Sequence, residues 1–155
     1  MIHRIALLVV LLAAVSSLDA RKKPNFSGTW RANFAQSKLQ FSQPESTVFV
    51  IEHREPEFFL TRTHVFQGKS DTWGARLTTD GKEVVRKEPG RTLHMRVTWE
   101  GDSLVFDVKI EKADGNATDV VKYGISRDGK TFTALERYRD AQNSYDNVWV
   151  FDRVK

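Results

Sequence analysis

The sequence predicts an all-β protein, a single up-and-down antiparallel β-barrel of about eight to ten strands with little helix. Apolar and polar residues alternate along most of the chain, and glycine-containing turns separate the alternating segments. So many strands would leave unpaired sheet edges unless the sheet closed on itself or formed two packed layers. Closure is favoured because nearly all connections are short and local, whereas Greek-key sandwiches usually need longer crossings.

Residues 1–20 have the composition of a secretory signal peptide. A basic start ending at Arg4 is followed by an apolar run, Ile5 to Val15, and then by small residues ending at Ala20, with Ser16 as a second candidate cleavage point. The run of about 11 residues is shorter than the roughly 20 that a membrane span needs, although an uncleaved anchor is the alternative. We therefore expect residues 21–155 to form one domain that is secreted or periplasmic and is not stably inserted in a membrane.

Composition excludes several classes of protein. The chain has no cysteine, so it is neither a disulfide-stapled scaffold nor a zinc site built on thiolates. Its net charge of +4 is mild and spread along the chain, and Arg21–Lys23 is its one basic run. We expect no nucleic-acid partner, because no stripe of arginine and lysine is present. A monomer is the favoured oligomeric state.

Five strands are expected in the first half of residues 21–155. Their ranges are Phe26–Asn33, Thr47–Arg54, Glu57–Phe66, Asp71–Thr79 and the short Lys82–Lys87. Between the first two, Phe34–Ser42 could hold a turn of helix, which Pro44 would limit.

The second half predicts a meander of five further strands. Their ranges are Arg91–Trp99, Ser103–Lys112, Ala117–Ser126, Lys130–Arg139 and Asn147–Val154. The alternation is clearest in Arg91–Trp99, where Leu93, Met95 and Val97 share one face. Turn signals centred on glycines, several of them Asp-Gly pairs, recur at spacings of roughly 9 to 14 residues and are typical of hairpins.

The segment NFSGTWRANFAQSK, residues 25–38, resembles the first-strand motif of the calycin superfamily, which includes lipocalins and fatty-acid-binding proteins. Together with VWVFDR near the end, it is similar to small secreted bacterial lipocalin-like proteins. The resemblance implies that Trp30 plugs the closed end of the barrel and that an arginine on the last strand packs over its ring. Gly28 would allow that close approach. Arg153 is our candidate partner for the ring, with Arg137 and Arg139 as alternatives.

One departure from the family concerns the ligand. Fatty-acid-binding proteins hold a carboxylate with an Arg-x-Tyr pair on the last strand, and Trp149 and Phe151 stand in the equivalent places here. A fatty-acid ligand is therefore not implied.

The segment EFFLTRTHVF can face the interior in two ways. If Phe58, Leu60 and Phe66 point inward, Arg62 and His64 do too. In the other register both lie in water. A buried arginine must be paired or meet an anion. The first register therefore predicts a polar anchor inside the barrel, formed by Arg62, His64 and Glu136.

Aromatic residues complete the candidate ligand site. Tyr123 and Tyr138 share faces with apolar neighbours and could orient a ligand through their hydroxyls, or simply fill the core. Trp73 and Trp99 could line the cavity mouth or pack inside, and Phe106 lies on the inward face of its strand.

The function we expect is binding of a small apolar or amphipathic molecule, without catalysis and without a cofactor or metal. No nucleophile elbow, His-Glu-x-x-His helix or phosphate-binding glycine loop is present. One alternative is an interaction module with a filled barrel that acts through loops Gln40–Ser46 and Asp140–Asn147. Another is an isomerase or cyclase on the same barrel.

Overall fold

The computed structural model describes residues 22–154, which form ten strands. The expected signal peptide lies outside these residues. The strands are β1 (Gly28–Ala32), β2 (Ser46–Arg54), β3 (Glu57–Phe66), β4 (Lys69–Thr78), β5 (Val84–Glu88), β6 (Arg91–Glu100), β7 (Ser103–Lys112), β8 (Ala117–Ile125), β9 (Thr131–Arg139) and β10 (Ser144–Arg153). Within residues 22–154, no helix is long and apolar enough to cross a bilayer.

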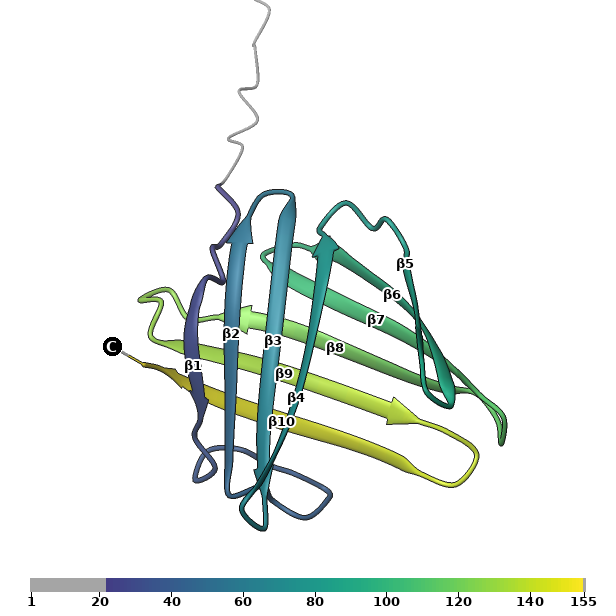
Figure 1. Ribbon diagram of the computed structural model, residues 1–155. Coiled ribbons are helices and arrows are strands. Elements are labelled where there is room, and N and C mark those ends of the chain that lie inside the picture. Colours follow the sequence, from purple (N-terminus) through teal and green to yellow (C-terminus); the bar gives the residue numbers. More distant parts are fainter. Residues whose placement is uncertain (1–21, 155) are drawn as a thin grey trace, which may run out of the picture.

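All ten strands belong to one continuous antiparallel sheet. Its order is β4-β3-β2-β1-β10-β9-β8-β7-β6-β5, so sequence neighbours pair throughout and β1 joins β2 to β10. In Figure 1, β1 to β4 run down the front of the molecule and β6 to β10 cross behind them. The sheet thus curls into a nearly closed up-and-down barrel, which confirms the predicted fold class.

Alternation explains the inner surface of the barrel. In β6, the side chains of Leu93, Met95 and Val97 are buried, and they oppose apolar residues of β7 that are turned the same way. Because successive side chains of a strand point to opposite faces, this pattern puts one row in the core and the other in water. Burial of this one-sided surface is the main force that closes the sheet.

The connection between β1 and β2 contains no helix among the described residues. Residues 34–36 form a turn, and Lys38 then makes an isolated bridge with Val148 of β10. The segment is pinned to the barrel end instead of coiling, because the rings of Phe34 and Phe41 pack against Trp149. Of the two outcomes left open for Phe34–Ser42, the helical turn does not form.

The barrel is not sealed between β4 and β5. These strands are neighbours in sequence, yet no backbone ladder joins them within the described chain. After β4 the chain pairs with β6 instead, through a bridge between Asp80 and Thr98 and a hydrogen bond from Gly81 N to Val97 O of 3.0 Å. The expectation of a fully closed cylinder is corrected here, because the residues after β4 cross to β6 and leave β5 as a short edge.

An aromatic plug closes one end of the barrel. Trp30 is fully buried, its ring centroid lies 5.5 Å from that of Phe132, and its indole N–H donates to Phe26 O at 3.0 Å. The guanidinium carbon of Arg153 lies 4.1 Å from the Trp30 ring centroid. Gly28 lies directly beneath this guanidinium, and a Cβ there would overlap it.

Candidate functional site

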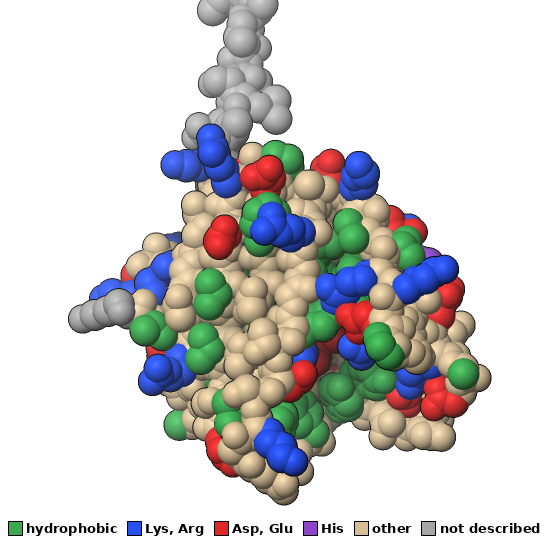
Figure 2. All heavy atoms as spheres, viewed as in Figure 1, with side chains coloured by type: hydrophobic (Ala, Val, Ile, Leu, Met, Phe, Trp, Pro, Cys, Tyr) green, Lys and Arg blue, Asp and Glu red, His purple; other side chains and the backbone are tan. Residues whose placement is uncertain are grey.

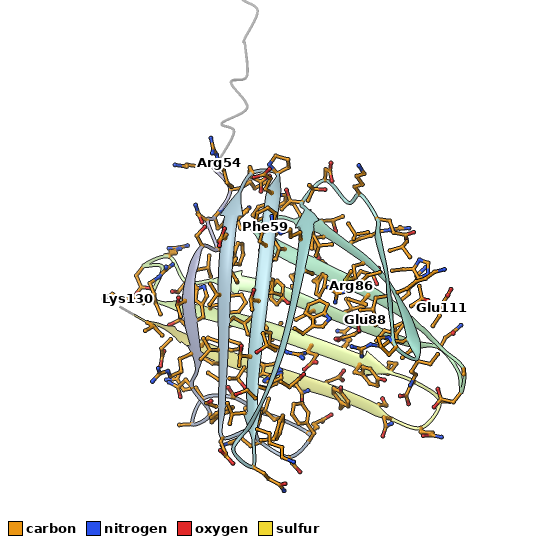
Figure 3. The ribbon with its side chains drawn as sticks, in the orientation of Figure 1. Arg54, Phe59, Arg86, Glu88, Glu111 and Lys130 are labelled. Atoms are coloured by element: carbon orange, nitrogen blue, oxygen red, sulfur yellow. The ribbon has the colours of Figure 1, made fainter. Side chains whose placement is uncertain are left out.

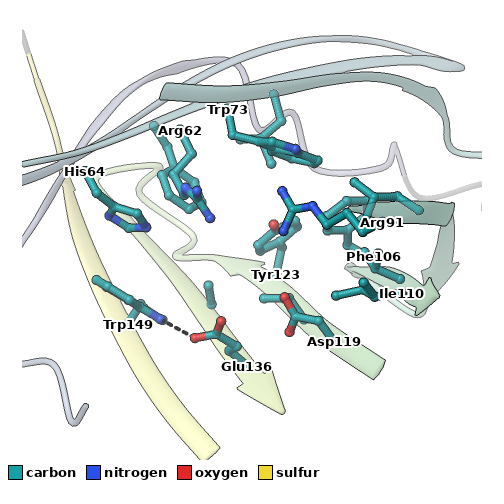
Figure 4. A pocket seen from close by; sticks show the side chains of 16 residues that line it. Arg62, His64, Trp73, Arg91, Phe106, Ile110, Asp119, Tyr123, Glu136 and Trp149 are labelled. Atoms are coloured by element: carbon teal, nitrogen blue, oxygen red, sulfur yellow. Dashed lines mark hydrogen bonds between the residues drawn. The ribbon is translucent and has the colours of Figure 1, made fainter. Parts of the chain in front are cut away.

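A cavity of about 150 Å³ lies inside the barrel, away from the plug. Eight strands, β2 to β4 and β6 to β10, contribute the side chains that line it, ten of which are labelled in Figure 4. The lining residues are Phe49, Leu60, Arg62, His64, Trp73, Arg91, Leu93, Phe106, Val108, Ile110, Asp119, Val121, Tyr123, Ala134, Glu136 and Trp149. Figure 2 shows a hollow in the surface beside β4, with apolar and charged side chains at its edges.

Strand β3 presents Arg62 and His64 to the cavity, so the inward register is the observed one. Arg62 Nη2 lies 3.1 Å from Asp71 Oδ2, an ion pair to an exposed carboxylate. The His64 ring stacks on Trp149 with centroids 5.7 Å apart, and its Nδ1 lies 2.8 Å from the Thr47 hydroxyl oxygen. Burial and the positive charge of Arg62 lower the pKa of His64 to about 4. The His64 imidazole is therefore uncharged at neutral pH and forms part of the cavity wall.

The facing wall carries two carboxyl groups. Glu136 Oε2 accepts hydrogen bonds from Trp149 Nε1 and Asn147 Nδ2, both at 2.8 Å. Asp119, on the next strand, is mostly buried, and its Oδ1 has no hydrogen-bond partner among the described residues. Burial and the nearby Glu136 charge raise the pKa of Asp119 to about 7. The two neutral donors of Glu136 therefore fix one carboxylate, while the other stays available to the cavity.

Tyr123 lies between these walls. The side chain is 2% exposed, and its ring centroid is 6.4 Å from that of Phe106 in a stacked arrangement. Burial, and after it the negative charges of Asp119 and Glu136, raise the pKa of its hydroxyl. The hydroxyl therefore stays protonated and can donate a hydrogen bond into the cavity (Figure 4).

Side chains bridge the opening between β4 and β5. Arg86 donates to Gly74 O of β4, and its guanidinium carbon lies 4.6 Å from the Trp73 ring centroid. Glu88 accepts from Trp73 Nε1 at 3.2 Å and pairs with Arg91 at 2.6 Å. Burial disfavours its charge, but the bonds from Arg91 and Trp73 outweigh this and lower the pKa of Glu88. Figure 3 shows Arg86 and Glu88 beside β5, facing this gap.

The structure brings most of the expected site residues to one cavity. Arg62, His64, Trp73, Phe106, Tyr123 and Glu136 all line it. Trp99 and Tyr138 do not. Trp99 packs near the plug, 6.1 Å from Phe26, and donates to Glu55 at 2.9 Å. Tyr138 stacks on Tyr145 with centroids 4.8 Å apart and donates to Asp140 at 2.8 Å.

Four polar or aromatic lining residues are not among those the sequence predicted: Phe49, Arg91, Asp119 and Trp149. Asp119 shares one face of β8 with Ala117, Val121 and Tyr123. This spacing of two residues is the sequence signal that predicts its inward orientation. For Trp149 the sequence indicates only a departure from the fatty-acid-binding pattern and not its contact with the cavity. Within residues 22–154, no group of three or more His, Asp or Glu side chains is placed to hold a metal ion.

Comparison with solved structures identifies the fold. A secretory abundant heat soluble protein from Ramazzottius varieornatus matches with a TM-score of 0.61 at 10% identity, covering 83% of this chain and 94% of that one. Human cRBP IV matches with a TM-score of 0.57 at 18% identity, covering 84% and 99%. A zebrafish ileal bile acid-binding protein, complexed with cholic acid, matches with a TM-score of 0.53 at 17% identity, covering 83% and 98%.

At the level of sequence, no protein-family model and no curated protein matches the chain significantly. The structural likenesses lie below 25% identity, so they establish architecture. This chain therefore has the calycin-like β-barrel fold.

Proposed function

We propose that the protein binds a small apolar or amphipathic molecule inside its barrel and does not change it chemically. The observation that carries the proposal is the cavity, which has apolar walls on several strands and a few convergent polar groups. This is the usual character of a small-molecule site. The structural neighbours support it, since those named above include a bile acid-binding protein with cholic acid bound.

The size of the cavity favours a compact ligand. A cavity of about 150 Å³ matches the engineered apolar cavity that binds benzene in another protein. Pockets for drug-sized ligands are larger, roughly 300–1,000 Å³. A ligand with a long chain would have to displace the side chains that bridge β4 and β5. Among these, Arg86 and Arg91 have the longest and most flexible side chains.

The sequence supports two further parts of the proposal. The segment 1–20 favours a secreted or periplasmic protein, with no lasting membrane insertion after its removal. The lack of recognisable catalytic motifs favours binding over turnover.

A second candidate function rests on a different observation, the contact between the two segments that the sequence predicts as interaction surfaces. Loop 40–46 lies against segment 140–147, whose last four residues begin β10. Gln40 N donates to Asn147 Oδ1 at 2.7 Å, and Asp146 N donates to Gln40 Oε1 at 2.7 Å. This joined surface could bind a partner protein while the interior acts only as core.

A pair of variants on β8 separates the two functions. Val121→Phe fills the cavity, whereas Val120→Phe places the same ring on the outer face of the same strand. We expect toluene to quench the fluorescence of the wild-type tryptophans and of Val120→Phe, but not that of Val121→Phe. Native mass spectrometry of the purified protein should show a co-purified small molecule. Equal quenching in both variants, or none in the wild type, would contradict interior binding.

A further inference from the structure

Two polar atoms of the cavity, Asp119 Oδ1 and Arg62 Nε, are buried without hydrogen-bond partners among residues 22–154. The hydroxyl of Tyr123, which also lines the cavity, is a third polar group there. Tyr123 is 98% buried, so its hydroxyl faces the cavity and not bulk water. Buried polar groups in native proteins are nearly always bonded. A ligand that offers partners to these groups therefore gains over a purely apolar one.

The cations around the cavity already have carboxylate partners. Arg62 pairs with Asp71 at 3.1 Å and Arg91 pairs with Glu88 at 2.6 Å. Glu136, by contrast, is held by two neutral donors and has no ion-pair partner among residues 22–154. A carboxylate entering the cavity would meet Glu136 and Asp119 without a free cation, and such juxtaposition of like charges is costly in a buried site.

A cationic ligand fits no better. An ammonium group could approach Asp119, but it would share the cavity with the Arg62 guanidinium, whose carbon lies 6.0 Å from the ring centroid of Trp73 on the neighbouring strand. An ammonium has donors alone. It would therefore leave the Arg62 Nε–H and the Tyr123 O–H without an acceptor.

We infer that the ligand is a neutral apolar molecule bearing a hydroxyl group. Its O–H donates to Asp119, and its oxygen accepts from Tyr123 or Arg62 (Figure 4). A hydroxyl suits this arrangement because it is one donor and two acceptors in a single uncharged group. The inference rests on the proposed function, since it requires the interior to be the binding site.

Four probes of one skeleton test it: benzyl alcohol, benzoate, benzylamine and toluene. Their binding to the purified protein at pH 8 is measured by titration with Trp fluorescence and checked by calorimetry. We expect benzyl alcohol to bind about tenfold or more tightly than benzoate and benzylamine, and more tightly than toluene. Benzoate or benzylamine binding as tightly as the alcohol would overturn the inference while leaving interior binding intact.

Asp119→Asn is the decisive variant, with Asp107→Asn on the outer face of β7 as its control. The amide keeps the size of the carboxyl group and removes its charge. We expect the ratio of alcohol to benzoate affinity to fall about tenfold in Asp119→Asn, with toluene binding unchanged, and to stay constant in Asp107→Asn. An unchanged ratio in Asp119→Asn would contradict the role of that carboxyl. If none of the four probes binds, toluene included, the proposed function falls together with the inference.

Discussion

Arg153 covers the indole of Trp30, with its guanidinium carbon 4.1 Å from the ring centroid. The same guanidinium donates to Ser27 O at 2.8 Å and to Gly129 O at 2.7 Å. It therefore ties the start of β1 and the turn before β9 to the last strand. The plug is held from outside by one side chain that reaches three parts of the chain.

Replacing this arginine should loosen the closed end. Arg153→Ala removes the cation–π contact and both hydrogen bonds, and we expect a loss of about 2 kcal/mol in the free energy of unfolding, measured with urea. Arg137→Ala, an exposed arginine on β9, is the control and should change it by less than about 0.5 kcal/mol. Equal effects of the two substitutions would argue against a special role for Arg153.

Gly28 should tolerate no side chain while Arg153 is present. Its φ of +146° is unfavourable for other residues, and a Cβ would overlap the guanidinium. We expect Gly28→Ala to cost about 2 kcal/mol. In Arg153→Ala the overlap is gone, so the same substitution should cost less there. A double-mutant cycle measures this coupling, and strict additivity would mean that the two residues do not interact.

Asp119 should make stability fall as the pH rises. Its native pKa of about 7 is above the usual 3.8, so between those values the native carboxyl keeps a proton that the unfolded chain has released. The free energy of unfolding therefore decreases with rising pH across this window, by at most about 4 kcal/mol. Asp119→Asn should remove the decrease in urea titrations from pH 4 to 8. A variant that follows the wild-type pH profile would refute this.

His64 should act in the opposite direction. The native pKa of His64, about 4, is below the usual 6.5. Between these two values the imidazole is protonated in the unfolded chain but not in the native protein. Stability is lost as the pH falls through this window. The two trends offset each other in part in the wild type. In Asp119→Asn we expect the free energy of unfolding to rise clearly with pH, and in His64→Gln we expect it to fall. Identical pH slopes in the two variants would contradict the assignment.

Trp149 should be needed to hold Glu136. Trp149→Phe keeps an aromatic ring but removes the 2.8 Å bond to the carboxylate, and we expect it to destabilise the protein by about 1–3 kcal/mol. Trp73→Phe removes a longer bond, 3.2 Å, to Glu88, which keeps Arg91 as a charged partner. It should therefore cost less, and thermal unfolding of both variants shows whether it does.

Much of the fold was predictable because local signals agree with it. Alternation along segments such as Arg91–Trp99 and the recurrent glycine turns specify strands and hairpins without any long-range information. The gap between β4 and β5 was not predictable, because consecutive strands ordinarily pair. Whether the residues around Asp80 pair with β5 or cross to β6 depends on the completed barrel and not on the local sequence.

The site was harder to predict for a related reason. In β3, alternation allowed Arg62 and His64 to face either water or the interior, and the bulk of the neighbouring apolar residues decides it only once the sheet is closed. Asp119 was missed because a carboxylate in a strand ordinarily indicates the wet face. Its burial beside Glu136 requires both strands to be placed, which a single segment cannot reveal.

The most direct measurement of the central claim is a methyl NMR titration with benzyl alcohol. The claim is that a small molecule occupies the interior between the polar walls. We predict shifts confined to methyl groups that line the cavity, such as those of Val108 and Val121, with Val50 and Val85 on the outside unchanged. Shifts limited to outer methyl groups, or no shifts at all, would contradict it.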